Sequence, residues 1–312
     1  SHKQEDVERD GRRSRPIGTT GRGIGIAYAH KALRDGIRVA DLDWAEHLEE
    51  LTAEDRAFVE EYRDRLLDIA VDLSSFMHDD VSPRRSSRRR ALLEGAQGSL
   101  LDIDVGTYPY VSSGSSSAAG ASAGAAVGPR EIDRVVGVFK AYSTRVGNGP
   151  FPSEFDPAGE GELERYIRET GREYGVTTGR PRRVGYLDLP ALRYACRVNG
   201  IDSLALTHLD VYDELDEIRL CIGYETEGET LDYFPASIPL LEHAKPITRR
   251  FPGWKTPIGG VRSYDELPER AREYIRFIEE YVDTAVDIVS VGYKREQTIV
   301  RSSVWEPRDG TR

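Results

Sequence analysis

The chain has 312 residues, 38% of them hydrophobic, and its 54 acidic and 43 basic side chains give a net charge of -11. This acidic balance argues against nonspecific binding to nucleic acid or anionic lipid, and no run of about 18 apolar residues predicts a membrane-spanning helix. The two cysteines, Cys196 and Cys221, are too few for a disulfide framework. We therefore expect buried thiols, a cytoplasmic location, and either one large domain or two smaller ones.

The chain begins with residues 1–16, which are polar, charged and without a hydrophobic period, so we interpret them as a solvated lead-in. We assign the remaining residues, 17–312, to a single domain. A glycine-rich run at residues 17–25 opens this domain and leads into a helix that we predict near residues 27–34.

The clearest helical pattern lies at residues 52–73, where apolar residues recur at helical spacing. Thr52 and Asp55 have the spacing of a capping pair for its first turn. An arginine-rich stretch follows at residues 83–90, which we interpret as a solvated loop rather than a nucleic-acid patch. A short strand is predicted at residues 91–93.

A Ser/Ala/Gly run occupies residues 112–128. Its composition is typical of a flexible linker, but small side chains also allow the backbone to approach a ligand closely. The sequence leaves these two alternatives open. We predict a helix after this run, at residues 130–141.

The second half of the chain alternates predicted helices and strands. The expected helices span residues 190–199 and 268–282, and the expected strands span residues 203–207, 218–224 and 286–291. This alternation is typical of an α/β fold. We expect a mostly parallel central sheet with helices on both faces and smaller appended elements.

The glycine-rich run at residues 17–25 has the sequence Ile-Gly-Thr-Thr-Gly-Arg-Gly-Ile-Gly. Backbone amides and hydroxyls before a helix can form an anion cradle. The competing interpretation, which this motif alone favours, is a glycine turn with a threonine cap.

Two further segments are rich in polar groups. The block Thr-Thr-Gly-Arg-Pro-Arg-Arg at residues 177–183 carries three guanidinium groups, which suit carboxylate and phosphate oxygens, although an ordinary basic loop would look the same. Asp210 follows a predicted buried strand, where its carboxylate can either accept hydrogen bonds from a guanine base or cap the next helix.

Taken together, these and other polar, glycine-rich blocks resemble the adenylosuccinate synthetase family in content, order and spacing from about residue 17 to residue 299. The block at residues 17–25, Glu-Gly-Ala-Gln-Gly at residues 94–98, Lys-Ala-Tyr-Ser-Thr-Arg-Val-Gly at residues 140–147 and the arginine-rich block at residues 177–183 are specific as a set. The resemblance implies a ligase of AMP biosynthesis that joins IMP and L-aspartate with GTP.

The resemblance also implies the binding roles of particular residues. Arg34 corresponds to a side chain that crosses a dimer interface to the partner's IMP, which implies a homodimer. The implied IMP-binding residues are Thr20, Arg34, Gln97, Ser112 and Arg180. The implied aspartate-binding residues are Val176, Thr177, Thr178, Gly179, Arg180, Pro181 and Arg182.

The implied guanine pocket departs from the family at one position. His208 stands where the family usually has a lysine beside the base, and an imidazole can still stack there. The implied GTP-binding residues are Arg182, His208, Leu209, Asp210, Ser290, Val291 and Gly292.

The family's catalytic aspartate and histidine have no counterpart in the printed sequence. In the family they lie in a Gly-Asp-Glu-Gly-Lys-Gly-Lys phosphate loop and a Gly-His-Thr segment, and the loop's aspartate also binds Mg²⁺. Asp6 and Asp10 lack such a context. We therefore assign no catalytic or metal-binding residue, expect the family's first strand to be missing, and predict that this chain alone is inactive and poorly stable. A truncated record of a true synthetase, a nucleotide-binding pseudoenzyme and one half of a split enzyme remain as alternatives.

Overall fold

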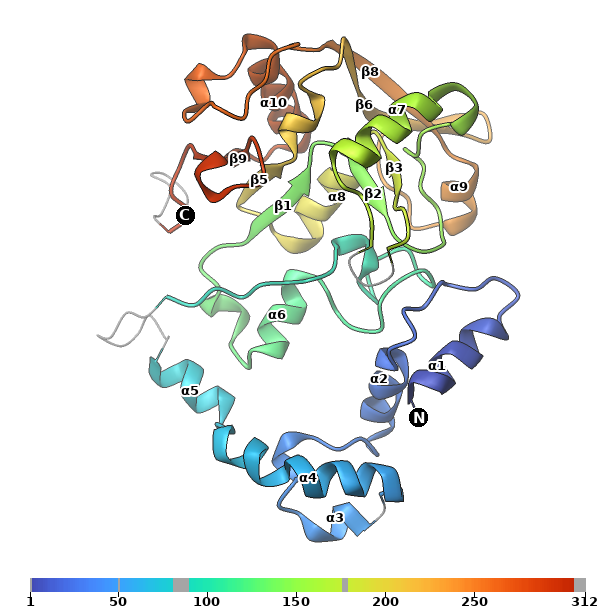
Figure 1. Ribbon diagram of the computed structural model, residues 1–312, viewed down its shortest axis with the longest axis vertical. Helices are drawn as coiled ribbons and strands as arrows, with labels where there is room; N and C mark the ends of the chain where they lie inside the picture. Colours follow the sequence, from blue (N-terminus) through green and yellow to red (C-terminus); the bar gives the residue numbers. More distant parts are fainter. Residues whose placement is uncertain (1, 50, 81–89, 176–178, 306–312) are drawn as a thin grey trace. The chain divides into compact units, whose positions relative to one another are not determined.

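The computed structural model describes residues 2–49, 51–80, 90–175 and 179–305. The chain divides into two compact units (Figure 1). Unit 1 consists of residues 1–97 and 112–132, and unit 2 consists of residues 98–111 and 133–312. Both cysteines are free thiols buried in unit 2, as expected.

All regular elements in the described part of unit 1 are helices. Its elements are α1 (His2–Gly11), α2 (Ile24–Leu33), η1 (Val39–Asp41), α3 (Ala45–Glu49), α4 (Ala53–Ile69), α5 (Leu73–Asp80), α6 (Ala118–Gly124) and η3 (Pro129–Glu131). Helix α1 lies within the stretch interpreted as a solvated lead-in, and two of its polar residues, Asp6 and Asp10, bind the loop before α2. The predicted helix near residues 27–34 is confirmed as α2.

Helix α4 begins as predicted, because the Thr52 hydroxyl accepts a hydrogen bond from the Asp55 amide at 3.2 Å. It ends at Ile69, and a separate helix begins at Leu73. No residue of α4 is buried, and Phe58 is 60% exposed. The predicted apolar stripe is therefore not a core face in this structure.

Two predictions in the middle of the chain are wrong. The strand expected at residues 91–93 is not formed, and those residues have no regular structure. The helix expected at residues 130–141 is replaced by strand β1 (Val136–Lys140), whose β-branched residues suit an extended backbone. A Cβ at Gly137 would lie 2.5 Å from Ile201 Cδ1 and 2.9 Å from Leu204 Cδ2, so these two side chains would have to move to accept a larger residue.

Unit 2 contains the sheets and the main hydrophobic core. Its central sheet has the strand order β1–β5–β9–β10, in which β1, β5 (Ser203–Thr207) and β9 (Val286–Ser290) are parallel (Figure 1). The short strand β10 (Thr298–Val300) is antiparallel to β9. The predicted α/β fold with a mostly parallel central sheet is confirmed.

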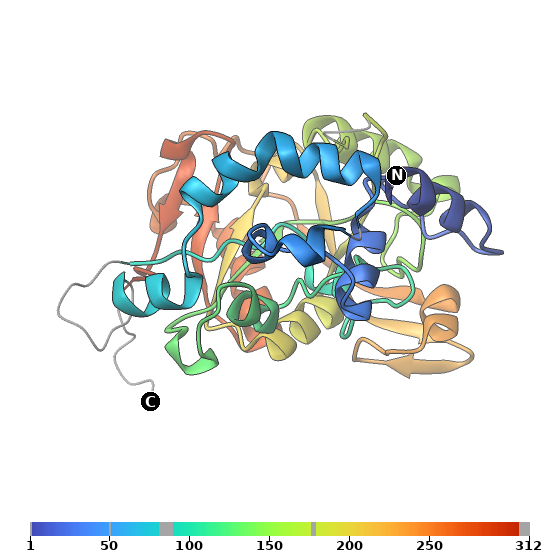
Figure 2. The same ribbon diagram turned by 90° about the horizontal axis from the view of Figure 1, so that it is seen from below.

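A second sheet of unit 2 is built on β6 (Glu217–Thr226). Strand β4 (Leu187–Asp188) is parallel to it, and β7 (Glu229–Leu231) and β8 (Lys245–Pro252) are antiparallel. Helix α9 (Ile238–His243) packs against β6 (Figure 2). A separate pair is formed by β2 (Ser143–Arg145) and β3 (Arg183–Gly185).

The helices predicted at residues 190–199 and 268–282 are confirmed as α8 and α10. Helix α8 (Leu189–Asn199) ends at Gly200, which has the left-handed backbone expected of a helix C-cap. Helix α10 (Glu269–Val282) buries Ala271, Ile275, Ile278 and Val282, as predicted. The other helical elements of this unit are η2 (Ser99–Leu101), α7 (Pro157–Thr170), η4 (Leu209–Tyr212), η5 (Tyr264–Glu266) and η6 (Arg295–Gln297).

Candidate functional site

The carboxyl ends of β5 and β9 bring together two segments that lie far apart in the sequence. The strands are parallel neighbours, with Leu206 opposite Val289. His208 follows the end of β5, and Ser290 is the last residue of β9. Ligands of α/β sheets bind preferentially at this edge, so the two predicted guanine segments are placed where a shared pocket can form.

The first segment presents a histidine and a carboxylate on a tight turn. His208 has a left-handed backbone with φ of 59°, and η4 begins directly after it. Asp210 is half-buried, and this burial raises the pKa of its carboxyl, while its own backbone amide and His208 act in the opposite direction. Leu209 is fully buried, so its side chain supports the turn instead of facing a ligand.

The second segment is held in a tight conformation at the end of β9. The Ser290 hydroxyl donates a hydrogen bond to the Gly292 carbonyl at 2.8 Å. A Cβ at Gly292 would lie 2.4 Å from the Gln297 side chain, so a larger residue here would displace Gln297. Val291 is fully buried and can offer a ligand only its backbone.

The predicted aspartate segment is closed at its base by backbone hydrogen bonds. The Gly175 amide donates to the Arg180 carbonyl at 2.8 Å, and the Arg182 amide donates to the Glu173 carbonyl at 2.8 Å. Gly179 has a left-handed φ of 62°. Val176, Thr177 and Thr178 lie outside the described residues. Arg180 and Pro181 are exposed.

Arg182 is anchored beneath this segment. Its Nη1 donates to Glu173 Oε2 at 2.8 Å. Its Nε is buried and has no hydrogen-bond partner among the described residues. A buried donor without a partner is costly, and a ligand oxygen would satisfy it.

Glu173, Lys140 and Tyr142 were not assigned a role from the sequence. Glu173 is 1% exposed, and its Oε1 accepts hydrogen bonds from Lys140 Nζ and from the Tyr142 hydroxyl, both at 2.6 Å. Lys140 and Tyr142 belong to the block at residues 140–147, which the sequence marked as specific. The position of Glu173 nine residues before Arg182 was the only local sign of its contribution.

In unit 1 the glycine-rich run is organised by the chain's own carboxylates. Asp10 accepts hydrogen bonds from the amides of Ile17, Gly18 and Thr19 at 2.8, 3.0 and 3.0 Å. Asp6 accepts from the Thr19 hydroxyl at 2.9 Å and from the Gly23 amide at 3.1 Å. The anion-cradle alternative is therefore wrong for these amides, because internal carboxylates already occupy them.

The pKa of the Asp10 carboxyl reflects this arrangement. Burial raises the pKa, but the three backbone hydrogen bonds outweigh it and hold the value below the ordinary range. Asp10 is therefore a structural carboxylate at neutral pH. The loop that it fixes presents Thr20 on an exposed position of unit 1.

Of the remaining predicted IMP residues of unit 1, Arg34 lies at the end of α2 and Ser112 lies near this helix. Arg34 is the C-cap of α2, with a left-handed φ of 69°, and is exposed. Ser112 precedes Gly114, at which a side chain would collide with the Tyr28 hydroxyl of α2. The Ser/Ala/Gly run therefore approaches α2 closely at this point, whereas its predicted approach to a ligand stays a prediction, and α6 occupies the middle of the run. Gln97 is exposed and has no regular secondary structure.

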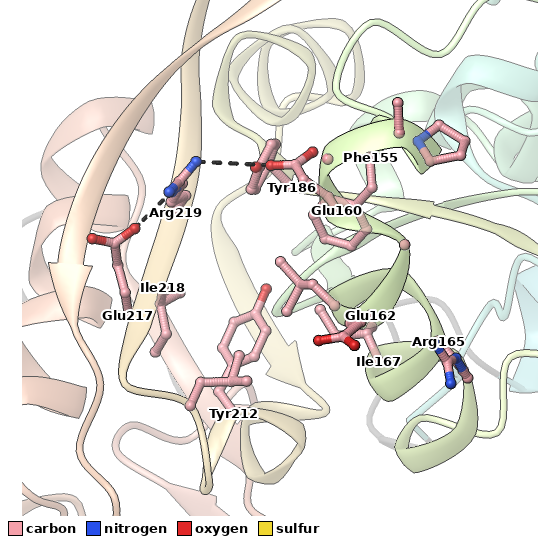
Figure 3. Close-up of a pocket in the computed structure, with 16 residues that line it drawn as sticks. Phe155, Glu160, Glu162, Arg165, Ile167, Tyr186, Tyr212, Glu217, Ile218 and Arg219 are labelled. Carbon is pink, nitrogen blue, oxygen red and sulfur yellow. Dashed lines mark hydrogen bonds and ion pairs between the residues drawn. The ribbon is translucent and has the colours of Figure 1, made fainter.

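A cavity of about 650 Å³ lies between α7 and the start of β6, and none of the predicted site residues lines it (Figure 3). Arg219 in its wall makes ion pairs with Glu217 at 2.7 Å and Glu160 at 3.8 Å. Glu162 and Arg165 also line it. Three carboxylates against two guanidinium groups do not suit a nucleotide triphosphate.

Two searches cover only the part of the chain that the structure describes. No cluster of three or more His, Cys, Asp or Glu side chains that could hold a metal ion is found there. No helix in that part is long and apolar enough to cross a membrane.

Comparisons with known proteins agree with the motifs. The family model for adenylosuccinate synthetase matches residues 1–299, so the likeness also includes α1. Two curated relatives, the adenylosuccinate synthetases of Clostridium novyi (strain NT) and Picosynechococcus sp., are each 47% identical to the chain. The matches cover 91% and 93% of this chain and 70% and 68% of the relatives.

Solved structures give the same result. The fully ligated adenylosuccinate synthetase of Plasmodium falciparum matches with a TM-score of 0.87 and 36% identity, over 96% of this chain and 75% of that one. The succinoaminodeoxyadenylate synthetase of cyanophage S-2L, at 20% identity, a TM-score of 0.55, and 96% and 66% coverage, shares the fold. The family match over nearly the whole chain and the identity of the curated relatives show that this chain belongs to the adenylosuccinate synthetase family.

Proposed function

We propose that the described residues form the IMP, aspartate and guanine-nucleotide binding parts of an adenylosuccinate synthetase. The family consists of GTP-dependent ligases of purine biosynthesis, and 47% identity to named synthetases supports this activity. In the proposed reaction the 6-oxygen of IMP attacks the γ-phosphate of GTP and releases GDP. The aspartate amine then displaces phosphate from 6-phosphoryl-IMP, which yields adenylosuccinate.

The observation that carries this proposal is the meeting of two segments at the carboxyl edge of the central sheet. His208 and Asp210 follow β5, and Ser290 and Gly292 follow β9 beside it. Asp210 is a half-buried carboxylate, suited to accept hydrogen bonds from the N1–H and the amino group of guanine. Adenine offers no such pair of donors, which would make the site select guanine.

Arginine side chains supply the positive charge in this proposal. Arg182 is held by Glu173 and has a buried donor to offer, so we assign it to GTP and to the aspartate carboxylate. Arg180, at the exposed base of the same segment, is assigned to IMP and aspartate. Guanidinium groups suit both phosphate and carboxylate oxygens.

Unit 1 contributes to IMP binding in this proposal through Thr20, Gln97 and Ser112. Arg34 is assigned to the IMP of a second subunit in a homodimer, which its exposed position at the end of α2 permits. In such a dimer each site is completed by its partner. A cytoplasmic location also remains a prediction.

The family resemblance implies Mg²⁺, and we assign no ligand for the ion among the described residues. They contain no cluster of three or more His, Cys, Asp or Glu side chains that could hold a metal. We therefore route no step through the metal. The printed sequence also has no counterpart of the family's catalytic aspartate and histidine, so nucleotide binding without synthesis is the alternative function for this chain alone.

Calorimetric titration of the 312-residue chain with GDP and with ADP tests the guanine site. We expect GDP to bind more tightly, and Asp210→Asn to weaken GDP about 10- to 100-fold, because a charged hydrogen bond contributes about 1.5–3 kcal/mol. Asp202→Asn, an exposed change just before β5 and therefore at the end of that strand opposite to Asp210, is the control. Equal affinity for GDP and ADP would contradict the guanine assignment.

A product assay on the same purified 312-residue chain distinguishes synthesis of adenylosuccinate from nucleotide binding alone. We expect IMP and GDP to bind, while a mixture of IMP, GTP, aspartate and Mg²⁺ yields no adenylosuccinate by absorbance, since a missing general base alone costs about 10²–10⁴-fold. Product formation at the rate of a full synthetase would show that this chain needs no further catalytic group.

A further inference from the structure

Glu173 is a buried carboxylate that connects three separate segments of unit 2. Its Oε1 accepts from Lys140 Nζ and the Tyr142 hydroxyl, and its Oε2 accepts from Arg182 Nη1. Burial raises the pKa of this carboxyl, but the hydrogen bonds from Lys140, Tyr142 and Arg182, together with the charge of Lys140, outweigh the burial and lower it. Glu173 is therefore ionised at neutral pH and acts only as an acceptor.

The direction of the Tyr142 hydrogen bond has a consequence for His208. The hydroxyl lies 2.6 Å from Glu173 Oε1 and 3.3 Å from His208 Nδ1. A phenol has one proton, and here it is donated to the carboxylate. The Tyr142 oxygen can then only accept a hydrogen bond from His208, so Nδ1 must carry the proton.

The environment keeps both groups in these protonation states. Burial, followed by the hydrogen bond to Glu173, raises the pKa of Tyr142 far above its usual range. Burial is the main cause that lowers the pKa of His208, and Lys140 and Arg182 add to it against the opposing charges of Glu173 and Asp210. His208 is therefore neutral at pH 7, with Nδ1 as donor and Nε2 as acceptor.

Backbone contacts also restrain the segments that carry Arg182 and His208. The Glu173 carbonyl accepts from the Arg182 amide, so residue 173 holds residue 182 by main chain and side chain together. His208 has a left-handed backbone, which is unusual for a residue with a Cβ, and the contact to Tyr142 restrains its ring. One buried carboxylate thus restrains both segments.

We propose that Glu173 is a positioning residue that holds Arg182 directly and, through Tyr142, sets His208 as the Nδ1–H tautomer. The imidazole then offers Nε2 as an acceptor for an N–H or O–H group of the guanine nucleotide, where a lysine would offer only donors. The ligand in this statement rests on the proposed function, whereas the tautomer does not.

The tautomer is tested by ¹H–¹⁵N correlation spectra of the histidine rings in the labelled 312-residue chain, with His208→Gln used for assignment. We expect the Nδ1–H pattern in the wild type. Tyr142→Phe removes the acceptor, and Glu173→Ala frees the Tyr142 proton for donation to Nδ1, so both variants should change to the Nε2–H pattern. Glu173→Gln keeps a carbonyl oxygen for Tyr142 and should retain Nδ1–H.

A matched control addresses general damage to the fold. Glu279 is also a poorly exposed carboxylate, and it accepts from Arg301 Nη1 at 2.6 Å and from the Val286 amide at 2.7 Å, away from both segments. Glu279→Gln should leave the His208 pattern unchanged. An Nε2–H pattern in the wild type, or an unchanged pattern in folded Tyr142→Phe, would overturn the proposal.

Calorimetric titration with GDP tests the link to the nucleotide. We expect Tyr142→Phe and Glu173→Gln to weaken GDP binding about tenfold, the first by releasing His208 and the second by weakening the hold on Arg182, while Glu279→Gln binds like the wild type. Equal affinity in all variants would overturn the positioning role. If the wild type binds no GDP, the proposed function fails, and the histidine spectra alone decide whether Glu173 sets the tautomer.

Discussion

Units 1 and 2 each contain a predicted substrate segment that is held by a buried carboxylate. The two carboxylates are stabilised in their ionised form by different kinds of hydrogen-bond donor. Asp10 in unit 1 accepts hydrogen bonds from three consecutive backbone amides of the Thr20 loop. Glu173 in unit 2 accepts from the side chains of Lys140, Tyr142 and Arg182. The first arrangement depends on one side chain and the local backbone, whereas the second needs four side chains in a packed core.

The hydrophobic cores of the two units also differ, in how many apolar side chains they bury. Unit 2 buries a large cluster that includes Leu206 and Ile278, and its fully buried tyrosines have hydrogen-bonded hydroxyls, as for Tyr274 with the Ala141 carbonyl at 2.8 Å. Unit 1 buries few apolar side chains, and α4 buries none. Side-chain geometry is precise where packing is dense, which explains why the ion-pair network lies in unit 2.

The largest expected effect compares the cores directly. Ile278→Ala in α10 should lower the free energy of unfolding by about 2–5 kcal/mol, because Ile278 is fully buried and a cavity would remain. Phe58→Ala in α4 should change it by less than about 0.5 kcal/mol, because Phe58 is exposed. Urea unfolding followed by fluorescence measures both. A loss at Phe58 as large as that at Ile278 would mean that α4 is covered in solution.

The second effect concerns the Asp10 loop. Asp10→Ala leaves the part-buried amides of residues 17–19 without their charged acceptor and should cost about 1–3 kcal/mol of local stability. Amide hydrogen exchange at Gly18 and Thr19 measures this loss as faster exchange. Glu5→Ala on the exposed side of α1 is the control and should leave these rates unchanged.

The pH dependence of this loop follows from the lowered pKa of Asp10. A carboxylate whose pKa is lowered by folding contributes stability that is present above its unfolded value, about 3.9, and is lost as the pH falls through the folded value. Amide chemical shifts of Gly18 and Thr19, recorded from pH 6 downward, should therefore move only below about pH 4. Movement at higher pH would show that Asp10 is not held by these amides.

The smallest effect lies at the start of α4. Thr52→Ala removes the hydroxyl that accepts from the Asp55 amide and should cost about 1 kcal/mol. Thr52→Ser keeps the hydroxyl and should behave like the wild type. Circular dichroism during thermal unfolding compares the two, and equal loss in both would assign the effect to the methyl group.

The sequence predicted elements best where local signals and burial agree. The bounds of strand β5 and helices α8 and α10 were predicted nearly to the residue. The apolar run of β5, the glycine that ends α8 and the 3.6-residue apolar period of α10 are each unambiguous signals. Strand β1 was mistaken for a helix, since its extended form depends on pairing with β5, which lies more than 60 residues later. Local residue propensities carry no information about a strand partner so distant in the sequence.

The candidate site shows the same division. The ordered blocks of residues by themselves determined the family, the α/β fold and the segments assigned to IMP, aspartate and guanine nucleotide. Only the tertiary structure decided that the segments after β5 and β9 are neighbours, that Asp6 and Asp10 occupy the amides of the glycine-rich run, and that Glu173 connects Arg182 to His208. These contacts join residues that are distant in sequence. Their energies depend on the burial of the groups and on the geometry of each hydrogen bond, and neither can be derived from local sequence patterns.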